Sequence, residues 1–171
     1  MSQTDKQIDK LKQKLEDIRR GLEPSDGYYA IHEFGDENFI EARPEVEHFL
    51  TSDDPRLRYI ALHVLTQHFG LQEYWGTALT FLRHDPDEDC RRMAASSLAS
   101  LKRNTKDTKT LEALARSVSN KSEDEDVRIR AYTAMREVLD FDGREQMRIV
   151  GPEFDLERDA DWQMIHSYIE S

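Results

Sequence analysis

Apolar residues near the N-terminus recur at alternating steps of three and four positions, which keeps their side chains on one face of a helix. The positions of this stripe are Ile8, Leu11, Leu15, Ile18 and Leu22. Gly21 and Pro24 then mark the end of the helix. The spacing predicts an amphipathic helix within residues 1–23 that caps the elements following it. The same stripe also suits a short coiled-coil seam, so a cap and a dimer contact both stay open.

Three later segments align without gaps and share one pattern. They are residues 55–65, 88–98 and 125–135. Each contains an apolar residue, an arginine directly after it, and an alanine three positions beyond the arginine. The shared alanines are Ala61, Ala94 and Ala131, and Ala30 and Phe34 mark a weaker copy before them. Successive alanines are 31, 33 and 37 residues apart, and such near-regular spacing indicates stacked supersecondary units.

A second set of helices is expected between these segments. Pro44 opens one that runs through Leu50, and residues 71–83 and 107–119 each carry an apolar helical face. Each copy therefore pairs a first helix, A, with a second helix, B. Because no segment alternates apolar and polar residues with a period of two, no strand is expected. The predicted fold class is all-α: an α-α superhelix of about four helical hairpins with a capping helix at each end.

An acidic turn precedes the A helix of each of the three clear copies. The turns are Asp53-Asp54-Pro55, Asp85-Pro86-Asp87-Glu88-Asp89 and Glu123-Asp124-Glu125-Asp126. An aspartate at the start of a helix accepts hydrogen bonds from backbone N–H groups that have no other partner. Its charge also favours the positive end of the helix dipole. We therefore expect these turns to cap the A helices.

The repeated residues stand as Asp54-Pro55-Arg56-Leu57-Arg58 with Ala61, as Asp89-Cys90-Arg91 with Ala94, and as Asp126-Val127-Arg128 with Ala131. This pattern resembles the HEAT-like repeat of the phycobilisome-lyase type over about residues 25–140. The resemblance implies a HEAT-like solenoid. It also implies that Arg58, Arg91 and Arg128 form a ladder, each pairing with the acidic turn of its own or the adjacent repeat. Repeats of this type serve scaffolds, adaptors, chromophore lyases and metal-dependent hydroxylases alike, so they do not define an activity.

The domain organisation predicted from these patterns is a single HEAT-like repeat domain over residues 1–171. Its N-terminal capping helix lies in residues 1–23 and its repeats lie in residues 25–150. A capping segment follows over residues 153–171. The apolar face of that segment consists of Trp162, Ile165, His166 and Ile169, which fall at helical spacing.

Composition narrows the classes of partner. The formal net charge is −11, and an acidic surface repels phosphate backbones, so nucleic acid is not expected and a basic protein is the more natural partner. Cys90 is the one cysteine, which excludes an intrachain disulfide and fits a cytoplasmic protein. No stretch approaches the ~20 apolar residues that span a bilayer, so neither a membrane span nor a signal peptide is expected.

The sequence offers no catalytic, cofactor-binding or metal-binding constellation. Cys90 aligns with apolar core positions of the other copies. No two histidines have the i, i+4 spacing that places two imidazoles on one helix face. His63 and His68 are five positions apart and would diverge by about 140° on an α-helix. His32-Glu33 is a single pair, whereas the hydroxylases among the HEAT-like proteins hold iron with such a pair on several repeats.

What remains is the surface of the B helices, where solenoids bind partners. Tyr74 and Phe81 are seven positions apart, and Phe49 takes the place of Phe81 in the preceding copy. We expect these rings to anchor a partner, with His48, Arg83 and Arg116 adding polar contacts. The alternative is that the rings of Tyr74 and Phe81 fill the seam between B helices.

The function predicted from the sequence is a non-catalytic protein-interaction module or scaffold, acidic, cytoplasmic and monomeric or dimeric. It would hold a partner protein in a groove lined by the B helices and use no cofactor. The alternative function, which follows from the family resemblance, is a chromophore lyase-like protein or a phycobilin carrier.

Overall fold

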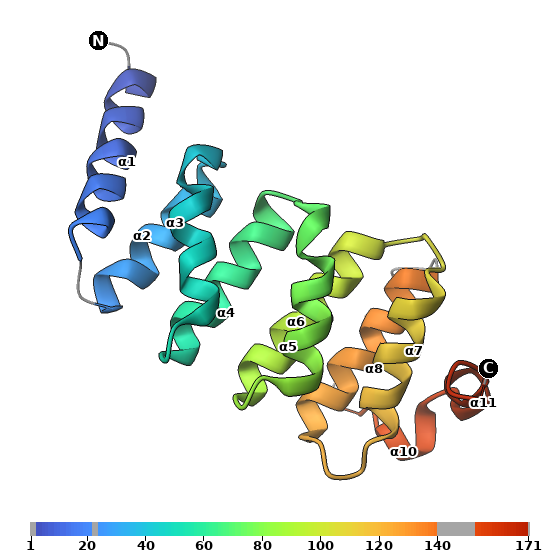
Figure 1. Ribbon diagram of the computed structural model, residues 1–171. Coiled ribbons are helices and arrows are strands. Elements are labelled where there is room, and N and C mark those ends of the chain that lie inside the picture. The colour runs from blue at the N-terminus through green and yellow to red at the C-terminus, as the bar shows by residue number, and fades with distance from the viewer. Residues whose placement is uncertain (1–2, 22–23, 140–152, 171) are drawn as a thin grey trace. The chain divides into compact units, whose positions relative to one another are not determined.

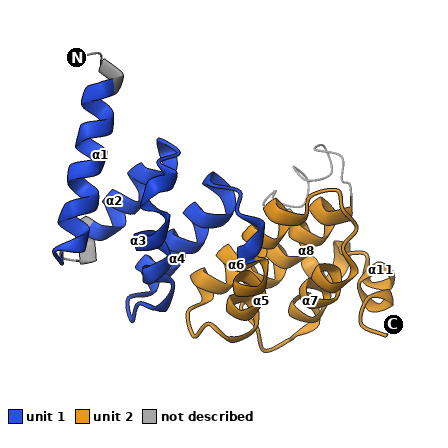
Figure 2. Ribbon diagram, turned by 45° about the horizontal axis from the view of Figure 1, so that its top comes forward, with its two compact units in different colours: residues 1–74 blue, residues 75–171 orange. Residues whose placement is uncertain are grey.

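The computed structural model describes residues 3–21, 24–139 and 153–170, and all regular structure in these ranges is helical (Figure 1). The predicted all-α class is therefore confirmed for the described residues. The chain divides into two compact units, residues 1–74 and residues 75–171 (Figure 2). Each unit is a set of packed helices and is described by itself.

The first unit consists of short helices. Its elements are α1 (Gln3–Arg19), α2 (Pro24–Asp36), η1 (Ile40–Ala42), α3 (Arg43–His48), η2 (Phe49–Thr51), α4 (Pro55–His63), η3 (Val64–His68) and η4 (Gln72–Tyr74). Helix α2 packs on α4 and η3, and α1 packs on α2 and α3. The side chains of Ile31, Phe34 and Val46 are fully buried at the centre. In the middle of the predicted N-terminal stripe, Leu11 and Leu15 are buried, whereas Ile8 at its start is 39% exposed.

Helix α4 does not continue as an α-helix but runs into the π-helical turn η3. In this turn the N–H of Phe69 donates to the carbonyl of Val64 at 2.9 Å, a step of five residues. Gly35 of α2 permits the wide turn, because a Cβ there would lie 2.8 Å from Val64 Cγ2. The expected divergence of His63 and His68 is therefore wrong: residues five apart face each other in a π-turn, and their Nε2 atoms are 3.0 Å apart.

The second unit contains the longer helices. Its described elements are α5 (Trp75–His84), α6 (Glu88–Lys102), α7 (Thr108–Ser119), α8 (Glu125–Leu139), α10 (Leu156–Asp159) and α11 (Trp162–Ser167). Helix α6 packs on α5 and on α8, and α8 packs on α7. Ala94 and Ala131 are completely buried at these contacts, because a methyl side chain allows two helix backbones to approach closely. Part of the last predicted repeat, residues 140–152, lies outside the described residues.

Aspartates cap the A helices, as predicted. The carboxylate of Asp54 accepts from the N–H of Arg56 at 2.9 Å, and that of Asp87 from the N–H of Cys90 at 3.0 Å. Asp124 precedes α8 and accepts from the N–H of Asp126 at 2.9 Å. These bonds satisfy backbone donors that the helices leave open at their first turn.

Two arginines of the predicted ladder, Arg58 and Arg91, make equivalent contacts. Nη1 of Arg58 donates to the carbonyl of Ser52 at 2.8 Å, and Nη1 of Arg91 donates to the carbonyl of Asp85 at 2.8 Å, in both cases six residues earlier. Arg91 also binds the carboxylate of Glu123 through Nε and Nη2, at 3.0 and 2.8 Å. The predicted pairing of Arg91 with the acidic turn of the following copy is thus confirmed.

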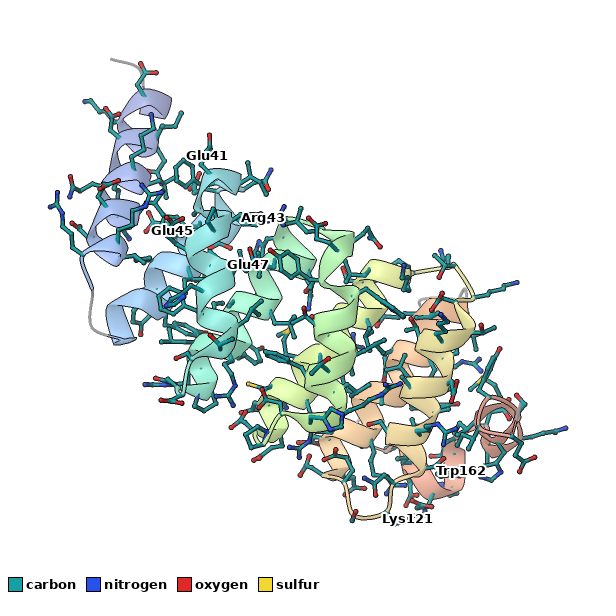
Figure 3. All side chains as sticks on the ribbon, in the orientation of Figure 1. Glu41, Arg43, Glu45, Glu47, Lys121 and Trp162 are labelled. Carbon is teal, nitrogen blue, oxygen red and sulfur yellow. The ribbon has the colours of Figure 1, made fainter. Side chains whose placement is uncertain are left out.

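The third arginine, Arg128, is 7% exposed and makes different contacts: a carbonyl ten residues earlier and a carboxylate of the C-terminal segment take the place of the predicted acidic turn. Its Nε donates to the carbonyl of Val118 at 2.8 Å and its Nη2 to Glu157 at 2.6 Å. Glu157 also pairs with Lys121, whose ammonium lies 4.9 Å from the centre of the Trp162 ring (Figure 3). These contacts hold the C-terminal segment 153–170 beside α7 and α8.

Replacing Arg91 with alanine tests whether the ladder stabilises the unit. The change leaves Glu123 and the carbonyl of Asp85 without their donor in a half-buried place, so we expect a loss of about 2 kcal/mol in the free energy of unfolding. Urea denaturation measures it. The matched control is Arg92→Ala, because the Arg92–Asp89 pair is exposed, and it should cost less than about 0.5 kcal/mol. Equal losses for the two variants would contradict a structural role for the ladder.

The pKa of His63 is lowered to about 4, chiefly by burial and then by the neighbouring His68 and His32, while Asp36 acts in the opposite direction. In the unfolded chain this imidazole takes up a proton near pH 6.5. As pH falls from about 6.5 to about 4, the unfolded chain binds a proton that the folded chain does not, so stability falls. His63→Gln should make that fall shallower in urea midpoints at pH 7 and pH 5. His84→Gln, at the exposed end of α5, should leave it unchanged, and a parallel fall in wild type and His63→Gln would refute the assignment.

Candidate functional site

The six residues predicted to contact a partner divide equally between the units. His48, Phe49 and Tyr74 belong to the first unit, and Phe81, Arg83 and Arg116 belong to the second. Two members of each trio line a common hollow on their own unit, whereas Tyr74 and Phe81 are buried. The two hollows are described in turn.

The hollow of the first unit lies between α1 and α3 and has a volume of about 500 Å³. Its lining residues are Ile18, Arg19, Gly21, Pro44, Glu45, His48 and Phe49. His48 is exposed and Phe49 half-buried. The walls are apolar at Ile18, Pro44 and Phe49, and polar at Arg19 and Glu45. This combination suits a peptide segment that presents both an apolar and a hydrogen-bonding group.

Glu45 is the main polar group of this hollow. Its Oε1 accepts from Nε of Arg19 at 2.5 Å, and Arg19 also binds Glu16 at 2.7 Å. Hydrogen bonds to Glu45 and Glu16 raise the pKa of Arg19 above its ordinary value. Oε2 of Glu45 is buried and accepts no hydrogen bond from the described residues. It is an acceptor that a donor from a partner would satisfy.

The segment that carries Glu45 is rich in carboxylates. Glu41, Glu45 and Glu47 come from η1 and α3, with Arg43 between them (Figure 3). Glu41 and Glu47 are exposed. Arg43 binds Glu73 at 2.9 Å and also interacts electrostatically with Glu47. The segment from Glu41 to Glu47 therefore carries three carboxylates to one guanidinium.

Tyr74 and Phe81 are 4% and 9% exposed, respectively. The hydroxyl of Tyr74 accepts from Nε of Arg43 at 3.1 Å, and the guanidinium of Arg43 lies 5.4 Å from the ring centre. Phe81 belongs to the buried face of α5. Their burial agrees with the alternative that these two rings fill helix contacts. Neither ring is therefore accessible to a partner.

The hollow of the second unit lies between the B helices α5 and α7 and has a volume of about 260 Å³. Its lining residues are Leu82, Arg83, His84, Ala113, Arg116, Ser117, Asn120 and Glu123. It brings together Arg83 and Arg116, which both lie in the last turns of their helices and are exposed. Arg116 pairs with Glu112 at 2.9 Å. Glu123, in turn, is held by Arg91, so the hollow combines cationic groups with one neutralised carboxylate.

Sequence reasoning missed several residues of the two hollows. Ile18 belongs to the apolar stripe of α1, and helical spacing gives no sign that it borders a hollow. Glu45 joins Arg19 across 26 positions, a separation at which no local pattern signals a pair. Ser117, whose buried hydroxyl has no hydrogen-bond partner among the described residues, likewise has no sequence signature.

Reactive groups are not concentrated in the described parts of the chain. Cys90 is completely buried in α6, as its alignment with core positions predicted. Within residues 3–21, 24–139 and 153–170, no three histidine, cysteine, aspartate or glutamate side chains are grouped so that they could hold a metal ion. No described helix is both long and apolar enough to cross a membrane.

Comparisons with known proteins add no family assignment: no protein-family model matches the sequence, and no curated protein matches it significantly.

The variants Phe81→Ala and Phe49→Ala test which of the two rings is a core residue and which belongs to the surface of a hollow. Phe81→Ala removes a buried ring and should lower the free energy of unfolding by about 3 kcal/mol. Phe49→Ala removes a half-buried ring and should cost about 1 kcal/mol. Thermal or urea unfolding of the two variants measures both losses. A loss for Phe49→Ala as large as that for Phe81→Ala would show that Phe49 is a core residue.

Proposed function

We propose that this chain is a non-catalytic protein-interaction module built from HEAT-like helical repeats that form a solenoid. A partner protein binds along its B helices, α3, α5 and α7. The observation that carries the proposal is that four of the six residues expected to contact a partner line two hollows, two residues in each. His48 and Phe49 border one hollow beside α3, and Arg83 and Arg116 border another between α5 and α7.

The equivalent contacts of the repeated residues support a repeat architecture. Arg58 and Arg91 each bind the carbonyl six positions earlier. The aligned Ala61, Ala94 and Ala131 are all completely buried. Residues at matching positions of stacked repeats are expected to make matching contacts, because every repeat presents the same faces to its neighbours.

The carboxylates in and near the first hollow support a partner with a basic segment. Glu45 lines the hollow, and Glu41 and Glu47 are exposed on the same segment outside its lining. Such carboxylates attract lysine or arginine side chains, and the net charge of −11 favours the approach of a basic protein. Phe49 offers an apolar contact next to Glu45. The module acts in the cytoplasm, as a monomer or a dimer, and needs no cofactor.

Alanine variants of the hollows test the proposal in two steps. The full chain, immobilised as bait, should first retrieve one stoichiometric protein partner from a native extract. Phe49→Ala combined with His48→Ala should then weaken binding of that partner by at least about tenfold, because central contact residues contribute about 1.4 kcal/mol or more. Arg83→Ala combined with Arg116→Ala should have a similar effect. Titration calorimetry or surface plasmon resonance measures the affinities.

Arg92→Ala, on the A helix α6, is the matched control and should bind as wild type does. Retained affinity in both double variants would place the binding surface elsewhere. No stoichiometric partner under several extraction conditions would overturn the interaction module itself. A visible absorbance band after the chain is mixed with a bilin would point instead to the chromophore carrier.

A further inference from the structure

The π-helical turn η3 creates a pair of facing imidazoles that no other part of the described first unit repeats. Nε2 of His63, at the end of α4, and Nε2 of His68, at the end of η3, are 3.0 Å apart, and their ring planes are perpendicular. Both side chains are half-buried, so solvent reaches them. π-Turns cost helix stability and are found frequently at functional sites.

A third imidazole lies beside this pair. His32 of α2 has its ring centre 6.4 Å from that of His68. Its Nδ1 pairs with Asp36 at 2.9 Å, which leaves Nε2 as the nitrogen with a free lone pair. A carboxylate that holds one ring nitrogen of a histidine in this way is the usual support of a metal-binding imidazole, because it fixes the tautomer and raises the basicity of the other nitrogen.

We propose that His63 and His68 chelate a divalent transition-metal ion of the Zn²⁺ type through their two Nε2 atoms, and that His32 turns toward them as a third ligand. Imidazole nitrogen is a preferred ligand of Zn²⁺, Cu²⁺ and Ni²⁺. Two such nitrogens bound to tetrahedral Zn²⁺ are about 3.3 Å apart. The observed 3.0 Å between the Nε2 atoms therefore needs only a small opening of the pair.

The free protein is not preassembled around a metal, because the ring centres of His32 and His68 are 6.4 Å apart and no three ligands converge among the described residues. In that state one imidazole of the pair donates its Nε2–H to the other. The metal takes the place of this proton, which passes through solvent to Nδ1 of the same ring.

Titration calorimetry of the full chain with ZnCl₂ at pH 7 tests the site. Wild type should bind one equivalent in a distinct phase, and His63→Gln and His68→Gln should each weaken that phase by at least about tenfold, since each removes a direct ligand.

A double variant, His84→Gln with His166→Gln, is the matched control, because both histidines are exposed in the second unit. It should keep the wild-type phase. An NMR spectrum of the imidazole nitrogens provides a second measurement that does not depend on a variant's folding: Zn²⁺ should shift Nε2 of His63 and His68 in the wild-type protein. Unchanged affinity in both His→Gln variants, loss in the control, or unshifted His63 and His68 signals would each overturn the proposal.

Discussion

The contact of a half-buried arginine with the turn that precedes its own helix is the interaction on which the second unit most depends. Arg91 binds the carbonyl of Asp85 and, at the same time, the carboxylate of Glu123. One guanidinium therefore ties the end of α5, the start of α6 and the turn before α8. A lysine could not replace it, since only the planar guanidinium presents several donors in fixed directions. Close packing through Ala94 then brings the helix backbones together around this anchor.

The two hollows differ in their polar groups although each lies beside a helix of the predicted B set. The ion pair of Arg19 and Glu45 borders the one next to α3, whereas Arg83 and Arg116 border the one between α5 and α7. Because their polar groups differ, the two hollows suit different segments of a partner under the proposed function.

Much of the fold could be predicted from the sequence because its signals are local and repeated. The spacing of Ala61, Ala94 and Ala131 located the A helices, and the acidic turns located their first residues. The environment of individual side chains was harder to predict. The π-turn at Val64–His68 depends on Gly35 of another helix, and the burial of Tyr74 depends on Arg43, 31 positions away. Contacts between residues so far apart leave no periodic pattern in the sequence. Four of the residues expected to contact a partner border the two hollows: His48, Phe49, Arg83 and Arg116. The groups that complete each hollow, such as Glu45 and Ser117, carry no signal in the sequence.

The proposed function requires that a partner protein bind along the B helices. Amide hydrogen exchange of the full chain, with and without the protein that it retrieves from extract, measures where the partner sits. New protection should be concentrated in residues 43–51, 75–84 and 108–119. Protection confined to the A helices α4, α6 and α8, or none at all with the partner bound, would contradict it.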